Sequence, residues 1–145
     1  MANYPLENMQ FVVNWGGDQI GFSEVSGLTM SNDVVEYRDG TAPEPNTIKM
    51  PGLRKFTNII LKRGVISGNY NLYNWMNSIS GNTVERRDLT ITLLDSARSP
   101  VLVWKVTNAW PCRLSYSPLI AGESRVMMEE VEIVHEGLTV QNSNG

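Results

Sequence analysis

The stretch MQFVVNWGGD at positions 9–18 combines two signals that decide the fold. Its large apolar residues Met9, Phe11, Val13 and Trp15 occupy every second position, which places them on one face of a β-strand. The Gly-Gly-Asp that follows supplies the left-handed backbone of a tight hairpin turn. A strand that leads into a hairpin is therefore the expected building unit of this chain.

The same two-residue alternation recurs along most of the remaining sequence. It predicts further strands over residues 19–25, 34–37, 56–63, 89–94, 101–108 and 124–136. In the last of these strands Glu130, Glu132 and Glu136 share one face, so these acidic side chains are expected to face water or a neighbouring subunit. Edge strands of such a sheet need protection or a partner chain, because their unpaired N–H and C=O groups invite pairing.

One segment has the spacing of a helix instead. Over residues 69–80, Leu72, Trp75, Met76 and Ile79 fall at i, i+3, i+4 and i+7, which predicts a single amphipathic helix. With seven or eight strands, this helix completes a mainly β fold, an antiparallel β-barrel or sandwich. A length of 145 residues predicts a single domain over residues 1–145.

The segment 39–51 is rich in residues that interrupt both helices and strands. Gly40, Pro43, Pro45 and Pro51 all fall within it. This composition predicts a long projecting loop, and long loops in compact domains are often functional. The residues of this loop considered for contacts with another subunit are Asp39, Gly40, Thr41, Ala42, Pro43, Glu44, Pro45, Asn46 and Lys49.

Charge and hydropathy narrow the classes of function. The net charge of −3 and the pI near 5.1 argue against stable nucleic-acid binding, which usually requires a basic face. The basic pairs at 54–55, 62–63 and 86–87 are isolated, and we interpret them as salt-bridge partners or rim charges. The longest apolar runs are far shorter than the roughly 20 residues of a membrane span, so no membrane anchor is expected.

The first ten residues lack the basic segment and apolar core of a secretory signal. The single cysteine, Cys112, excludes an internal disulfide framework, and no glycosylation sequence occurs. These features fit assembly in a reducing cytoplasm.

The residues available for catalysis or metal binding are few. His135 is the only histidine and Cys112 the only cysteine, so the usual zinc sites cannot form. The sequence from Gly21 to Ser23 begins like a nucleophile elbow, but Val25 stands where the second glycine is required. No glycine-rich phosphate loop occurs. We therefore expect no catalytic residue, no cofactor-binding residue, no metal site and no enzyme activity.

Two features are compatible with contacts between subunits. Glu130 and Glu132 share a strand face, and an acidic strip facing solvent or another subunit is favoured over a catalytic carboxylate pair. Trp110, between an alanine and a proline, either packs in the core or is buried at a subunit contact. The residues considered for subunit contacts are Glu36, Arg38, Trp110, Glu129 and Glu132.

Several short segments follow one another in the order and spacing of a known family. They are GFSEVSGL at 21–28, VEYRDG at 35–40, KMPGL at 49–53, NIILKRG at 58–64, LD at 94–95, AWP at 109–111 and EIVHEGL at 132–138. In these segments the chain resembles the tail-tube proteins of contractile-tailed phages and the inner-tube proteins of phage-tail-like, extracellular contractile injection systems. The resemblance covers nearly the whole sequence.

The resemblance implies a β-barrel subunit with one outer helix and no enzyme activity. It implies that six subunits form a ring and that rings stack into a rigid hollow tube inside a contractile sheath. The implied partners are other copies of the chain, the sheath protein, baseplate or tube-initiator proteins, the tape-measure protein and a cargo of DNA or protein effector. The implied location is a virion or extracellular particle that is assembled in the bacterial cytoplasm.

Other interpretations stay open at this stage. A tube-initiator or baseplate paralogue of the same particle would share the fold, although such proteins usually carry an extra domain. A small β-barrel that binds a ligand belongs to a different class. Tube subunits of phages, bacteriocin-like particles and effector-delivering particles resemble one another, so the cargo, the target cell and the residues facing the lumen are left undetermined.

Overall fold

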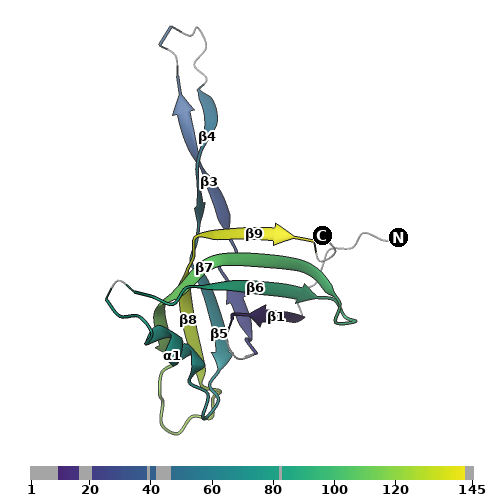
Figure 1. The fold of residues 1–145 in the computed structure, drawn as a ribbon, viewed down its shortest axis with the longest axis vertical. Coiled ribbons are helices and arrows are strands. Elements are labelled where there is room, and N and C mark those ends of the chain that lie inside the picture. Colours follow the sequence, from purple (N-terminus) through teal and green to yellow (C-terminus); the bar gives the residue numbers. More distant parts are fainter. Residues whose placement is uncertain (1–9, 17–20, 39, 42–46, 82, 143–145) are drawn as a thin grey trace.

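The computed structural model describes residues 10–16, 21–38, 40–41, 47–81 and 83–142. These residues form nine strands and one short helix (Figure 1). In chain order they are β1 (Gln10–Asn14), β2 (Glu24–Ser26), β3 (Met30–Tyr37), β4 (Ile48–Phe56), β5 (Ile59–Gly64), α1 (Asn71–Met76), β6 (Arg87–Leu94), β7 (Pro100–Tyr116), β8 (Met128–Val134) and β9 (Gly137–Gln141). The predicted mainly β, antiparallel fold with one helix is confirmed.

The long strand β7 belongs to two sheets. Its first half pairs with β6 and β9, and β1 continues this sheet beyond β6. Its second half pairs with β8, which is followed by β5 and then β2. Between the two halves Asn108 adopts a positive φ of 51°, a conformation that asparagine tolerates better than most residues. All of these pairings are antiparallel, so one bent strand joins the whole body of the domain.

The core lies between these sheets and is built from the alternating positions of each strand. Buried side chains come from β5 (Ile59 and Leu61), from β6, β7 and β9, and from β8 (Val131 and Ile133). The helix α1 lies outside the sheets and adds Leu72 to this core. Every second residue of these strands is thus removed from water, which is the main stabilising contribution in a domain of this kind.

An aromatic cluster attaches the helix to the first sheet. The ring of Trp75 from α1 lies 5.4 Å from the ring of Trp15, which follows β1. The guanidinium group of Arg87 lies 4.6 Å from the ring of Trp15 and 5.0 Å from that of Trp75, within the range of cation–π attraction. The indole N–H of Trp75 donates a hydrogen bond to the carbonyl oxygen of Glu85 at 2.9 Å. Trp75, predicted on the apolar face of the helix, is buried in the core, and Trp15 is buried beside it.

A buried ion pair links β5 to β8. Arg63 and Glu129 are opposite each other in the strand register, and their residues are 1% and 3% exposed. The Nε of Arg63 donates to the Glu129 carboxylate, and an Nη of Arg63 reaches Asn69, which precedes the helix. The pair therefore connects both strands to the segment that leads into α1.

Several predicted boundaries are wrong. Residues 48–51, expected in a loop, belong to β4, which ends at Phe56, so the strand predicted over 56–63 begins only at Ile59. The helix spans 71–76 rather than 69–80, because the hydroxyl and N–H of Ser78 both bond to the carbonyl oxygen of Trp75. Residues 124–136 contain β8 only from Met128, and β9 follows a turn at 135–136.

The strand predicted over 101–108 is also longer than expected, because β7 continues to Tyr116. Pro111 is accommodated there because the second half of β7 has a paired neighbour on one side, β8, and a proline nitrogen can face the open side of such a strand.

Gly27 offers a test of the packing between β2 and β5. Its φ of +88° disfavours other residues, and a Cβ placed on it would overlap the carbonyl oxygen of Asn58. Gly122 has a similar φ of +82° but no atom within 4 Å of such a Cβ. Left-handed strain alone costs about 1–2 kcal/mol. We expect Gly27→Ala to lower the free energy of unfolding by more than Gly122→Ala does, as measured by urea denaturation; equal losses would contradict the close contact.

The buried ion pair of Arg63 and Glu129 predicts different losses of stability at two neighbouring glutamates. Glu129→Gln leaves Arg63 buried without its counter-charge, which should cost about 3–5 kcal/mol of unfolding free energy. Glu130→Gln, one residue away on the opposite face, removes a carboxylate that pairs with Lys62 at 3.6 Å at the surface, and should cost no more than about 1 kcal/mol. Thermal and urea denaturation followed by tryptophan fluorescence compare the two variants. Similar small losses in both would show that the pair is not a structural element.

Candidate functional site

The residues considered for chemistry lie in separate structural contacts. Ser23 donates its hydroxyl to the carbonyl oxygen of Lys62 at 3.2 Å, and Nε2 of His135 donates to the carbonyl oxygen of Thr57 at 3.0 Å. Glu129 is occupied by Arg63. In the described part of the chain no group of three or more His, Cys, Asp or Glu side chains could hold a metal ion. These side chains are therefore not arranged as a nucleophile with a neighbouring base and acid.

Membrane insertion by a helix is also tested by the structure. Within the described ranges, no helix has the length and apolar character needed to cross a bilayer.

The exposed apolar side chains gather instead on two surfaces, and the first is a projecting hairpin. Strands β3 and β4 pair only with each other and extend away from the body (Figure 1); we call this hairpin the arm. Its register pairs Val35 with Met50 and Tyr37 with Ile48, so these four side chains form one apolar face. The opposite face carries the pair of Glu36 and Lys49, followed by the exposed Val34 opposite Pro51. The arm is therefore amphipathic although it projects into solvent.

An isolated two-stranded hairpin is only marginally stable, so the arm depends on its base. Phe56 packs against the core at the end of β4 and lies 5.6 Å from the ring of His135. Thr57 donates its hydroxyl to the carbonyl oxygen of Gly27 at 3.0 Å, and its own carbonyl accepts the bond from His135. His135 thus ties the arm to the corner between β8 and β9.

The second surface lies at the end of the body that carries α1. It is formed by the connection from β5 to α1, by α1 itself and by the loop from β7 to β8. The N–H of Val65 donates to the carbonyl oxygen of Met127 at 2.8 Å, which joins the first and last of these segments. We call this surface the apolar end, and its exposed large side chains are Val65, Ile66, Tyr70, Tyr73, Tyr116, Leu119, Ile120, Val126 and Met127.

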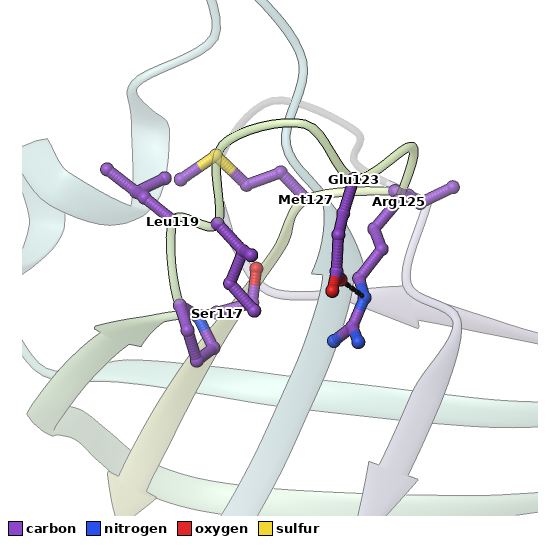
Figure 2. Close-up of a pocket in the computed structure, with 8 residues that line it drawn as sticks. Ser117, Leu119, Glu123, Arg125 and Met127 are labelled. Carbon is purple, nitrogen blue, oxygen red and sulfur yellow. Dashed lines mark ion pairs between the residues drawn. The ribbon is translucent and has the colours of Figure 1, made fainter.

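A groove of about 250 Å³ opens in the apolar end between residues 117 and 127. Figure 2 shows Leu119 and Met127 on one side of it and Glu123 with Arg125 on the other. The carboxylate of Glu123 lies 2.6 Å from the Nε of Arg125, so the charges of the rim neutralise each other. Beside the groove, partial burial and then the negative charge of Glu129 raise the pKa of the Tyr116 hydroxyl, which therefore stays neutral. The groove is thus a recess without net charge, lined by both polar and apolar groups.

The predicted loop residues are placed only in part. Gly40 and Thr41 form a turn, and Lys49 lies in β4 on the polar face of the arm. The other residues considered in this loop, Asp39, Ala42, Pro43, Glu44, Pro45 and Asn46, lie outside the described residues. The predicted loop does belong to the projecting arm, but its residues 48–51 form the start of strand β4.

The residues considered for subunit contacts separate into three locations. Glu36 lies in β3 of the arm, and Arg38 follows directly after that strand; both are exposed. Trp110 is half-buried in β7, and Glu132 bonds Asn58 at 2.8 Å on the outer face of β8. Glu129 is buried against Arg63, so its carboxylate makes an internal contact, and we leave it out of the contact surface.

The lone cysteine is a minor feature of this outer face. Burial, followed by the negative charge of Glu132, raises the pKa of the Cys112 thiol. The thiol donates weakly to the carbonyl oxygen of Glu132 at 3.5 Å. A structural role fits these contacts.

The sequence reasoning missed the apolar end. Its loop contains Pro118 and Gly122, which mark a turn region, and the apolar Leu119, Ile120 and Val126 stand between and after them. Exposed apolar side chains in a loop were the available signal, because a loop that served only as a connection would be expected to be polar.

Comparisons with known proteins give a family match and similar solved structures. Residues 7–139 match the family described as T4-like virus tail tube protein gp19. A chain of the PVC sheath-tube complex of an extracellular contractile injection system in the extended state is 37% identical, with a TM-score of 0.88 over 96% of this chain and 93% of that one. A chain of the tube-terminating cap of the anti-feeding prophage is 34% identical, with a TM-score of 0.90 over 99% and 95%.

A more distant structure, Hcp1 from Flavobacterium johnsoniae, is 15% identical with a TM-score of 0.60 over 92% of this chain and 95% of that one, and shows the fold alone. Comparison with curated protein sequences gives no match. The family consists of structural tube proteins, so the chain is a structural protein and not an enzyme. The resemblance found in the sequence is confirmed: the chain belongs to the family of the T4-like virus tail tube protein gp19.

Proposed function

We propose that the protein is the inner-tube subunit of a contractile, phage-tail-like injection particle. Six subunits form a ring, and the rings stack into a hollow, rigid tube inside a sheath. The observation that carries this proposal is the 37% identity, over nearly the full length of both chains, with a chain of a sheath-tube complex. The tube conducts DNA or a protein effector through the envelope of a target cell when the sheath contracts.

The strand edges support closure of a ring. In the body, β1 and β9 are the outer strands of the first sheet, and β2 is the outer strand of the second. A head-to-tail contact uses different surfaces on its two sides, and repeated by a closing rotation it generates a ring. Pairing between edges of neighbouring subunits satisfies backbone N–H and C=O groups that would otherwise be open to unrelated chains. Glu132 and Trp110 lie on this outer surface and are proposed contact residues.

The arm supports stacking of one ring on the next. It projects from the body, and it presents four apolar side chains that its own domain does not cover. Residues 39–49, with Glu36 and Arg38, are therefore proposed as the ring-stacking segment. In the assembled particle the further partners are the sheath protein, the baseplate or tube-initiator proteins, the tape-measure protein and the cargo. Assembly takes place in the bacterial cytoplasm.

A tube terminator is the second candidate, because a chain of a tube-terminating cap is 34% identical with a TM-score of 0.90. The baseplate relative is only 20% identical, which gives the initiator alternative less support. A ligand-binding barrel receives no support from the interior, where the core side chains pack between the sheets.

Electron microscopy of the purified protein tests the proposal. We expect hexameric rings, and hollow tubes at higher concentration or in the presence of sheath protein. Rings that add no further rings would favour the terminator. Monomers at all concentrations, with and without sheath protein, would contradict both candidates.

Shortening the arm separates stacking from ring formation. Replacing residues 38–47 by Asn-Gly keeps the pairing of Tyr37 with Ile48 and closes the hairpin with a two-residue turn. We expect this variant to form rings with normal diameter and to lose tubes, as counted in negative-stain images. Circular dichroism controls for the fold of the body. Tubes of normal length and stability would contradict a stacking role of the removed residues.

A further inference from the structure

We propose that Met50 is a site of oxidative modification, and that its sulfoxide stops the addition of rings to the tube. This inference rests on the proposed function and extends it, because it assigns a means of control to the apolar face of the arm. Met50 lies in β4 opposite Val35, on the face that both residues share with Tyr37 and Ile48. Of these four side chains, Met50 alone carries a sulfur atom, the group that peroxide converts from apolar to polar.

The methionines of the described residues differ in their access to solvent. Met50 is 45% exposed, Met30 40% and Met127 36%, whereas Met76 and Met128 are half-buried. Because oxidation by a dissolved peroxide follows exposure, the first three react before the other two. Met30 begins β3 at the base of the arm, and Met127 lines the groove of the apolar end. Met50 is therefore the accessible methionine on the apolar face of the arm.

The reaction transfers one oxygen atom from hydrogen peroxide to the thioether. A lone pair of the Met50 sulfur attacks one peroxide oxygen, so an S–O bond forms while the O–O bond breaks. The transferred oxygen gives up its proton, and the other oxygen, which leaves as hydroxide, takes up a proton and becomes water. The sulfur loses two electrons and the peroxide gains them. Methionine sulfoxide reductases reverse the change.

The sulfoxide changes association and leaves the fold of the subunit in place. Met50 lies outside the buried core cluster, so in a free subunit the new oxygen faces water. When another subunit covers the apolar face, this oxygen loses its hydration, and the side chain of its cross-strand neighbour Val35 offers no hydrogen-bond donor. Burial of a polar group without a partner is unfavourable. Because the cost recurs in every subunit of a ring, we expect oxidised rings to form but not to stack.

Assembly should in turn protect Met50 from the oxidant. In the proposed tube the apolar face of the arm is covered by another subunit, so peroxide reaches Met50 in free subunits and in single rings. Inside a stacked tube the sulfur is shielded. The modification therefore blocks the growth of a tube and does not dismantle a finished one.

Peroxide treatment before assembly tests the proposal. The parent protein carries Cys112→Ser, which removes the single thiol of the chain. Free subunits are treated with hydrogen peroxide, catalase removes the oxidant, and peptide mass spectrometry measures the sulfoxide at each methionine. We expect rings of normal diameter and a mean tube length at least fivefold below that of untreated subunits, with recovery after incubation with methionine sulfoxide reductases and a dithiol. Normal tubes from subunits oxidised at Met50 would overturn the proposal.

Matched variants assign the effect to one sulfur atom. Met50→Leu keeps an apolar side chain of similar volume and removes the thioether, so its tubes should stay within twofold of their untreated length after peroxide. Met30→Leu, a change of another exposed methionine, should leave the sensitivity of the parent. Met50→Gln introduces an uncharged polar group and should shorten tubes at least fivefold without peroxide. Equal sensitivity of Met50→Leu and the parent would overturn the assignment to Met50.

Treatment of preformed tubes provides a second measurement. We expect Met50 in tubes to be oxidised at least tenfold more slowly than in free subunits, as followed by the same mass spectrometry. Equal rates would overturn the protection of this residue by assembly. Untreated subunits that form neither rings nor tubes would contradict the proposed function itself, whereas tubes whose growth is insensitive to the sulfoxide would contradict this inference alone.

Discussion

The pairing of β7 with both sheets is the constraint on which the rest of the structure depends. Its first half bonds to β6 and β9 and its second half to β8, so the backbone of one strand fixes the angle between the sheets. That angle creates the space filled by the core and leaves one end of the body to α1 and the loop from β7 to β8. The buried ion pair of Arg63 and Glu129 then holds the strands at this end to the segment before the helix.

The arm and the apolar end are understandable only in an assembly. A soluble domain gains nothing by exposing Tyr37, Met50 and Leu119 to water, because exposed apolar area lowers solubility and invites association. The same side chains become stabilising when another copy covers them. Family membership and the sheath-tube relative supply the setting in which copies are held side by side. We therefore propose that the exposed surface, rather than a catalytic site, is the functional part of this protein.

The sequence predicted the fold class, the family and most of the strands, because alternation of apolar residues follows directly from burial of one strand face. It failed where residues that usually break strands are tolerated. Pro51 belongs to a hairpin without further neighbours, and Pro111 lies where β7 has one paired neighbour. The length of the helix was overestimated, because Ile79 continues the apolar spacing although the hydrogen bonds of Ser78 to Trp75 end the helix before it. The apolar end was missed because its residues converge from three separated segments, a proximity that no local pattern reports.

A cryo-electron microscopy reconstruction of the assembled protein tests the central claim most directly. The account predicts a hollow tube with six subunits in each ring, in which the apolar face of every arm is covered by a subunit of the adjacent ring. Rings whose arms stay uncovered, or stacked rings held together by other surfaces, would contradict it.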